Sequence, residues 1–250
     1  MTVKKFKHIG GRGDIIFGLP TMMLLGGGDL YITGDFVTNL LEIQPYINKV
    51  YMIHPEEFFK LEVDYDLSKF KEQDVAKYGI LRAHLDAFNL DVFGVDTSGS
   101  HWDLSKPWLF GIHPKPTVEI IINDTGTARW PGFTVNWDAL KPYESKCGFI
   151  GWDTEYEEFK KARSLNVKRI PVRHALEFAR VIKGSKLYIG NQSLGWAIAE
   201  GLKCPRVIDS TYGMIQEYPQ SQNGHTELTC DIIEKYLGQW RPKHPDSPYI

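Results

Sequence analysis

The sequence predicts an α/β protein of two lobes, each built around a parallel sheet. Short apolar runs alternate with helix-length amphipathic segments, which is the pattern of strands and helices that follow one another. The segment 98–116 interrupts this rhythm with Pro, Gly, Ser and Trp and is typical of a linker. With 250 residues the chain is long enough for two modest lobes. We therefore expect an N-terminal lobe over 1–112, a C-terminal lobe over 113–238, and a polar, proline-rich tail over 239–250.

In the first lobe, two strands and two helices are predicted. Strands are expected over 29–33 and 49–53, which are short and rich in apolar and β-branched residues. Residues 36–44 predict a helix between them that stops at Pro45, and residues 84–94 predict a helix that closes with a glycine.

The second lobe repeats the same rhythm with more elements. Its predicted strands cover 118–123, 148–152, 186–190 and 204–208. Its predicted helices cover 155–165, 174–184 and 194–202. Strand–helix–strand repetition at this spacing is typical of a parallel sheet with helices on its faces.

Charge, apolar stretches and cysteines argue against several classes of protein. The net charge of -2 and the pI near 6.5 argue against binding nucleic acid through its phosphates. No apolar stretch approaches the roughly 18–20 residues that span a bilayer. The apolar residues after the N-terminal lysines do not favour a signal peptide, because Gly18, Pro20 and a GGG run break them and no clear cleavage site follows. The three cysteines lie far apart, which favours reduced thiols in the cytoplasm, and neither they nor the eight histidines form a metal motif.

The candidate ligand sites are polar loops that follow predicted strands. Ligands of open parallel sheets collect at the carboxyl ends of the strands, where loops lead into helix N-termini. Those termini carry partial positive charge and unpaired amide groups, so they favour phosphates.

The first such loop is GGRGD, residues 10–14. Its glycines let the backbone approach a ligand, and Arg12 adds a guanidinium that suits phosphate. Asp14 is expected at the start of a helix, where an acid is favoured electrostatically even without a ligand. The segment lacks the GxGxxG spacing of a dinucleotide site because its third glycine comes too late, which weakens a role as an NAD-dependent oxidoreductase.

A second loop follows the predicted strand 186–190. Gly190, Asn191, Gln192 and Ser193 offer a rim that could bind anions and hydroxyl groups, although Asn191 or Ser193 could equally cap the helix that follows.

Two further loops carry hydroxyl, guanidinium and carboxylate groups. Thr125 and Arg129 follow the predicted strand 118–123, where a polar loop is also common for solvation alone. Gly151, Asp153 and Glu155 lie at and after the end of a strand. Their carboxylates could accept ribose hydroxyl groups or simply occupy the first turn of a helix.

Several of these segments resemble one family of enzymes. GDIIFGLP is similar to the GDxxxxLP signature that opens the heptosyltransferase-like glycosyltransferases, family 9. FIGWDTEYEEF and RVIKGSKLYIGNQSLGWAIAEGLKCPRVI resemble the nucleotide-sugar lobe of that family, and IIINDTGTARWPGFTVNW resembles the strand that opens this lobe in short, often phage- or plasmid-borne relatives. The resemblance covers most of the chain in the family's order. It implies a GT-B fold, in which two Rossmann-like lobes face each other across a cleft without a catalytic metal.

The resemblance also implies roles for individual residues. Asp14 matches the general base, which takes the proton from an acceptor hydroxyl during transfer with inversion. The co-substrate is a nucleotide-diphosphate sugar, the acceptor is an unidentified hydroxyl compound, and no other cofactor is implied. The diphosphate would lie against the second lobe, near helix N-termini and Arg129. The residues expected to bind the nucleotide sugar are Gly11, Arg12, Gly13, Thr125, Arg129, Gly151, Asp153, Glu155, Gly190, Asn191, Gln192 and Ser193.

One loop departs from the family pattern. The family loop usually runs Asp-Thr-Gly-x-Ser-His, whereas residues 191–196 run Asn-Gln-Ser-Leu-Gly-Trp. An amide thus replaces the usual acid, and Trp196 replaces the usual histidine. A different donor would explain this, and so would loss of transfer activity. The sequence therefore leaves two main hypotheses, a transferase and a non-catalytic module of the same fold that binds a nucleotide or sugar.

Overall fold

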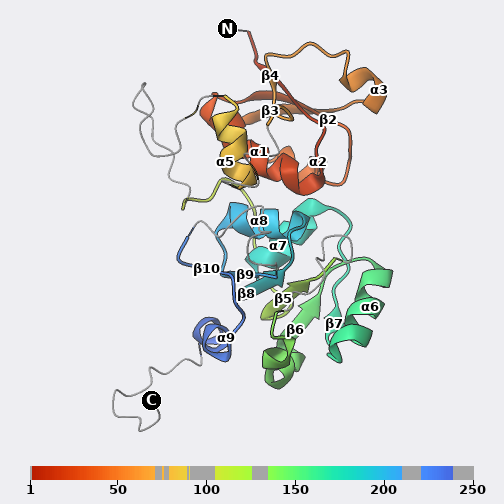
Figure 1. Cartoon of the computed structure of the whole chain (residues 1–250). Coiled ribbons are helices and arrows are strands. Elements are labelled where there is room, and N and C mark those ends of the chain that lie inside the picture. Colours follow the sequence, from red (N-terminus) through yellow and green to blue (C-terminus); the bar gives the residue numbers. More distant parts are fainter. Residues whose placement is uncertain are drawn as a thin grey trace.

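The computed structural model describes residues 2–70, 75, 79–88, 90, 105–125, 135–209 and 221–238, and these contain two separate sheets (Figure 1). The first has the strand order β3-β2-β1-β4, and the second has the order β10-β9-β8-β5-β6-β7. All strand pairs in the described part are parallel. The predicted α/β class with two parallel sheets is confirmed. The predicted tail, 239–250, lies outside the described residues.

In the first lobe every described helix except α3, which lies beside the sheet, is placed between the sheet and the second lobe (Figure 1). Its strands are β1 Lys5–His8, β2 Gly28–Ile32, β3 Ile47–Met52 and β4 Tyr65–Asp66. Its helices are α1 Arg12–Leu24, α2 Thr38–Leu41, α3 Pro55–Phe58 and α5 Ile80–Asp86. Alternation along β2 buries Leu30 and Ile32 against the helices and turns Asp29 and Tyr31 to the opposite face.

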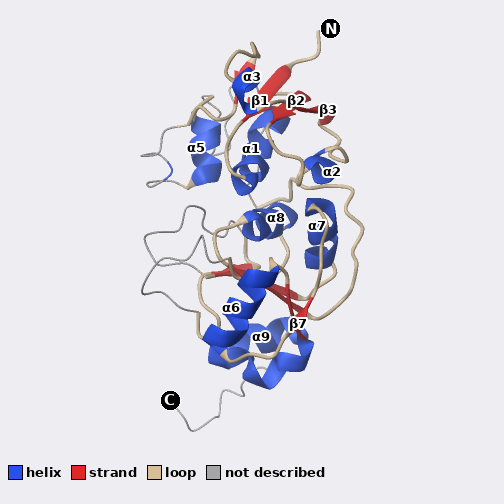
Figure 2. Cartoon of the chain, turned by 90° about the vertical axis from the view of Figure 1, so that its right-hand side faces the viewer, coloured by secondary structure: helices blue, strands red, loops and turns tan. Residues whose placement is uncertain are grey.

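The second lobe has helices on both faces of its sheet (Figure 2). Its strands are β5 Ile120–Asn123, β6 Cys147–Phe149, β7 Lys168–Arg169, β8 Leu187–Gly190, β9 Arg206–Ile208 and β10 Gly224–His225. Its helices are the 3-10 helix η2 Trp137–Lys146 and α6 Asp153–Arg163, α7 Ala175–Lys183, α8 Leu194–Leu202 and α9 Cys230–Leu237. The central strands β5 and β8 are buried throughout, as expected of parallel strands covered on both sides.

Helices α1 and α8 pack against each other where the lobes meet, so one hydrophobic core runs from the first sheet to the second. Residues 105–117, which contain neither helix nor strand, are anchored on both lobes. The Trp108 amide donates to the Gly201 carbonyl at 2.9 Å, and the Trp108 indole Nε1 donates to the Ile16 carbonyl in α1 at 3.1 Å. The lobe limits near residue 112 remain a prediction, because a shared core gives no separate boundary.

Two predicted helices have different bounds in the structure. The helix expected over 84–94 begins at Ile80 and ends at Asp86, because Ile80, Leu81 and Leu85 form its buried side; residues 91–94 lie outside the described part. The helix expected over 36–44 is reduced to α2. Gln44 leaves the helical path, and its side chain accepts from the Phe110 amide at 2.8 Å.

Candidate functional site

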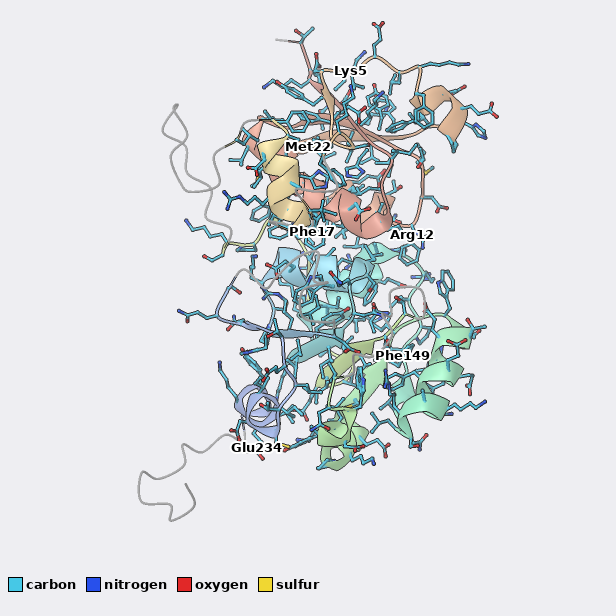
Figure 3. The ribbon with its side chains drawn as sticks, viewed as in Figure 1. Lys5, Arg12, Phe17, Met22, Phe149 and Glu234 are labelled. Carbon is cyan, nitrogen blue, oxygen red and sulfur yellow. The ribbon has the colours of Figure 1, made fainter. Side chains whose placement is uncertain are left out.

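A cavity of about 380 Å³ lies at the meeting of the two lobes. All four candidate loops of the sequence analysis, which lie far apart along the chain, contribute residues to its wall. The predicted residues that line it are Gly11, Arg12, Gly13, Asp14, Thr125, Gly151, Glu155, Gln192 and Ser193. Figure 3 shows Arg12 and Phe17 on the side of α1 that faces the second lobe.

Asp14 reaches the cavity from a tight turn between β1 and α1. The Gly10 amide donates to His8 Nδ1 at 2.9 Å, and the Gly11 amide donates to Asp14 Oδ2 at 2.9 Å. A Cβ at Gly10 would lie 2.5 Å from His8 Cε1, so this position has no room for a side chain. Burial raises the pKa of Asp14, while the Gly11 amide acts in the opposite direction. Asp14 is therefore both the expected acid in the first turn of a helix and a carboxylate on the cavity wall.

The start of α1 lies directly against the start of α8. A Cβ at Gly13 would lie 3.6 Å from the Ser193 carbonyl carbon, which is ordinary van der Waals contact. The first-lobe turn and the second-lobe loop thus form adjoining parts of one wall.

Three helices of eight or more residues begin at this cavity, and their first amides are not capped by the side chain of the N-cap residue. These are α1 after Gly11, α6 after Trp152 and α8 after Ser193. Lack of such a cap is common in this fold: among the described helices only α7 and α9 have one, from the side chains of His174 and Thr229. Uncapped first-turn amides carry partial positive charge and bind anions well.

Cationic and acidic side chains complete the charge pattern. The Arg12 guanidinium lies over the Phe36 ring, 4.8 Å from its centroid, at the start of α1. Glu155 accepts from the Trp152 amide at 2.8 Å and lines the cavity in the first turn of α6. The arrangement can bind an anion against the helix starts and hydroxyl groups against Asp14 and Glu155.

In the loop between β8 and α8, some residues are buried in packing and others line the cavity. The buried Asn191 Nδ2 donates to the Thr125 carbonyl at 2.7 Å, and Thr125 Oγ1 donates to Asn191 Oδ1 at 3.2 Å. A Cβ at Gly190 would lie 2.2 Å from the Tyr188 hydroxyl oxygen. Asn191 and Gly190 therefore shape the loop without lining the cavity, whereas Gln192 lines it.

Of the two remaining predicted positions, Asp153 does not line the cavity and Arg129 is not among the described residues. The Asp153 side chain is 80% exposed and pairs with Arg169 at 2.5 Å. Glu200, which was not a predicted site residue, is buried two turns into α8 in an ion cluster with Lys203 and Arg206.

Sequence reasoning missed the aromatic and aliphatic part of the wall. Phe17, Phe36 and Ile80 line the cavity from the first lobe, and Trp152 and Phe178 line it from the second. Trp152 could have been predicted from the sequence, because it directly follows Gly151 in one of the candidate loops. No sequence pattern marks the other lining residues, because only the packing of the two lobes brings them to this wall.

Within the described residues, no group of three or more His, Cys, Asp or Glu side chains is placed to hold a metal ion. Nor is any helix of the described part both long and apolar enough to cross a membrane.

Comparison with known proteins identifies the fold. No protein-family model and no curated protein sequence matches the chain. Solved structures do match, and together they define the class: the fold is that of GT-B glycosyltransferases of family 9. The family 9 resemblance seen in the sequence is thus confirmed at the level of the fold.

Three of these structures illustrate the likeness. The glycosyl transferase family 9 protein of Veillonella parvula is 13% identical with a TM-score of 0.61, over 94% of this chain and 89% of that one. Escherichia coli heptosyltransferase WaaC with ADP is 12% identical with a TM-score of 0.61, over 94% of this chain and 98% of that one. Escherichia coli ADP-heptose lps heptosyltransferase II is 13% identical with a TM-score of 0.54, over 94% and 97%.

Proposed function

We propose that this protein is a glycosyltransferase that binds a nucleotide-diphosphate sugar in the cavity and transfers the sugar to an acceptor hydroxyl with inversion. The observation that carries the proposal is the convergence on one cavity of the Asp14 carboxylate and three helix starts that no N-cap side chain caps. The comparisons add that a structure of the same fold, heptosyltransferase WaaC, was solved with ADP-2-deoxy-2-fluoro heptose.

In the proposed reaction Asp14 is the general base. It takes the proton from the acceptor hydroxyl as that oxygen attacks the anomeric carbon and the bond to the diphosphate oxygen breaks. Its raised pKa makes it a stronger base than an exposed aspartate. A positioned base of this kind contributes roughly 10²–10⁴-fold to the rate.

The leaving diphosphate gains negative charge as its bond to the sugar breaks. First-turn amides of α6 and α8 and the Arg12 guanidinium stabilise that charge, since they are fixed by the fold before the reaction begins. Glu155 accepts hydrogen bonds from the ribose hydroxyls of the donor.

The test compares two aspartates that both lie in the first turn of a helix. Asp14→Asn should lower the rate of transfer about 10²–10⁴-fold and leave nucleotide affinity within a few-fold. Asp231→Asn, in the first turn of α9, removes a helix-start acid away from the cavity and should change neither quantity. Nucleotide affinity is measured by calorimetry with ADP, UDP, GDP and CDP. Transfer is measured as release of the nucleoside diphosphate from the matching sugar donor. An Asp14→Asn protein that transfers as fast as the wild type would refute the base.

The second candidate function is a binding module without transfer activity. It is favoured by the buried side chain of Asn191 and by Ser193, whose Oγ donates to Asn123 Oδ1 at 2.8 Å, because both side chains serve the loop itself. Tight binding of a nucleotide sugar without release of nucleoside diphosphate across a panel of sugar and lipid-linked acceptors would support this function. Turnover with any donor would exclude it.

A further inference from the structure

Trp152 is the one described tryptophan whose side chain lies in solvent. It is 63% exposed on the rim of the cavity, whereas Trp108, Trp137 and Trp196 are all buried. An exposed indole leaves a large flat apolar surface in water, and here that surface adjoins the cavity, where it can contact a ligand.

The backbone that carries this ring is held on both sides. The Trp152 amide donates to Glu155 Oε2 at 2.8 Å, and the Trp152 carbonyl accepts from the Tyr156 amide at 3.0 Å. On the other side, a Cβ at Gly151 would lie 2.6 Å from Phe149 Cε1, so the chain is tightly packed there. None of the ring pairs or cation–π contacts of the described residues involves the indole, and at 63% exposure it has ring surface open to a planar ligand.

We propose that the base of the bound nucleotide stacks on Trp152. This inference rests on the proposed function and adds the residue that recognises the base. A nucleotide has the order base, ribose, diphosphate, and the second lobe offers matching groups. Trp152 presents a flat ring at the rim just before α6, Glu155 presents a carboxylate in the first turn of α6, and the starts of α6 and α8 present amides.

A sugar ring could also stack on an indole, but the proposed reaction places the transferred sugar at Asp14 and not at Trp152. The transferred sugar and the acceptor must lie at Asp14, which belongs to the first lobe, whereas Trp152 belongs to the second. The base is the part of the donor that lies farthest from the transferred sugar, beyond the ribose and diphosphate. Stacking on an aromatic side chain suits it because every base has a π face.

The experiment separates base binding from phosphate binding. Calorimetry is performed with ADP, UDP, GDP and CDP and with inorganic pyrophosphate on the wild type, Trp152→Ala, Trp152→Phe and Phe59→Ala. Trp152→Ala should weaken the best nucleotide roughly 5- to 150-fold and leave pyrophosphate within twofold. Trp152→Phe should give an intermediate loss. Phe59 is 75% exposed in the first lobe and away from the cavity, so Phe59→Ala should bind like the wild type.

Fluorescence gives a second readout that does not depend on affinity. The best nucleotide should quench tryptophan emission of the wild type, and most of this quenching should be absent from Trp152→Phe at saturating nucleotide. Thermal unfolding checks that each variant is folded, which is expected because the Trp152 side chain forms no cap hydrogen bond.

Three results would overturn the inference. If Trp152→Ala binds the best nucleotide as tightly as the wild type, the base does not stack there, and the proposed function still stands. If Trp152→Ala weakens pyrophosphate as much as the nucleotide, the ring shapes the phosphate site and does not recognise the base. If the wild type binds none of the four nucleotides, the proposed function itself fails, and the inference fails with it.

Discussion

Two buried histidines beneath the Asp14 turn should make the protein sensitive to mild acid. The side chains of His8 and His84 are fully buried, and their ring centroids are 5.2 Å apart. Burial lowers the pKa of His8 to about 3. Burial, and next the neighbouring His8, holds the pKa of His84 well below its usual value. The Gly10 amide donates to His8 Nδ1, a hydrogen bond that requires this nitrogen to be unprotonated.

The magnitude follows from proton binding in the two states. In the unfolded chain each histidine titrates near pKa 6.5, so below that pH the unfolded state binds more protons than the folded state. Stability therefore falls as the pH falls from about 6.5 towards the folded pKa values. From pH 7 to pH 5.5 each histidine should lower the free energy of unfolding by about 1.3 kcal/mol, and the pair by about 2.5 kcal/mol. Carboxylates with ordinary or lowered pKa values contribute little here, because they titrate near pH 4 in the unfolded chain. Asp14, whose pKa is raised by burial in the folded state, acts in the opposite direction and offsets part of the loss.

The assay is urea unfolding at pH 7 and pH 5.5, followed by circular dichroism. His84→Leu should remove about half of the acid-induced loss, since one proton site disappears. His113→Gln is the matched control, because His113 is exposed and should leave the loss unchanged. Part of any residual loss belongs to His225, whose pKa is lowered by burial and by nearby Lys235 and Arg206. A total loss below about 0.5 kcal/mol, or an unchanged loss in His84→Leu, would refute the reasoning.

Three substitutions away from the cavity probe the packing that supports it. Gly195→Ala would place a Cβ 2.4 Å from the Tyr188 hydroxyl oxygen and should destabilise the fold by about 1–3 kcal/mol in thermal unfolding. Glu200→Gln would leave the fully buried guanidinium of Arg206 without its carboxylate, so urea unfolding should show a loss of about 3–5 kcal/mol. Trp108→Phe removes the indole donor that binds an α1 carbonyl. It should lower the rate of transfer more than the affinity for nucleotide, and equal losses in both would contradict this.

Much of the second lobe could be predicted from the sequence because its pattern is local. The helix expected over 194–202 has those bounds in the structure, because an apolar helical segment there follows a polar loop. The structure ends the helix at Lys203, whose backbone is left-handed. The buried strands β5 and β8 also lie within their predicted ranges. The strand β1 was not predicted, because its two lysines interrupt the apolar residues. In the structure Phe6 and His8 point to the core, while Lys7 pairs with Asp66.

Within each candidate loop, the sequence could not separate residues that line the cavity from those that do not. Asp153 and Glu155 are both acids in the first turn of α6, yet only Glu155 lines the cavity. Residues two positions apart in a helix differ by about 200° around its axis, so Asp153 and Glu155 face nearly opposite directions. Asn191 and Gln192 are neighbours with similar side chains, and the path of the loop backbone alone buries one and brings the other to the wall.

The junction of the lobes decides whether the proposed reaction can occur. Asp14 comes from the first lobe, and the helix starts proposed to bind phosphate come mainly from the second, so their separation depends on the packing of α1 against α8. That packing is held by a shared core and by Trp108, which binds α1 through its indole and α8 through its amide. A Cβ at Gly201 would lie 2.8 Å from Leu109 Cδ1, so the connecting segment fits against α8 because this position is glycine. The position of the base relative to the leaving group is therefore built by core residues that touch no ligand. Since misplacement of a reacting group by about 1 Å can lower a rate 10²-fold, these core residues control the chemistry as much as the cavity wall does.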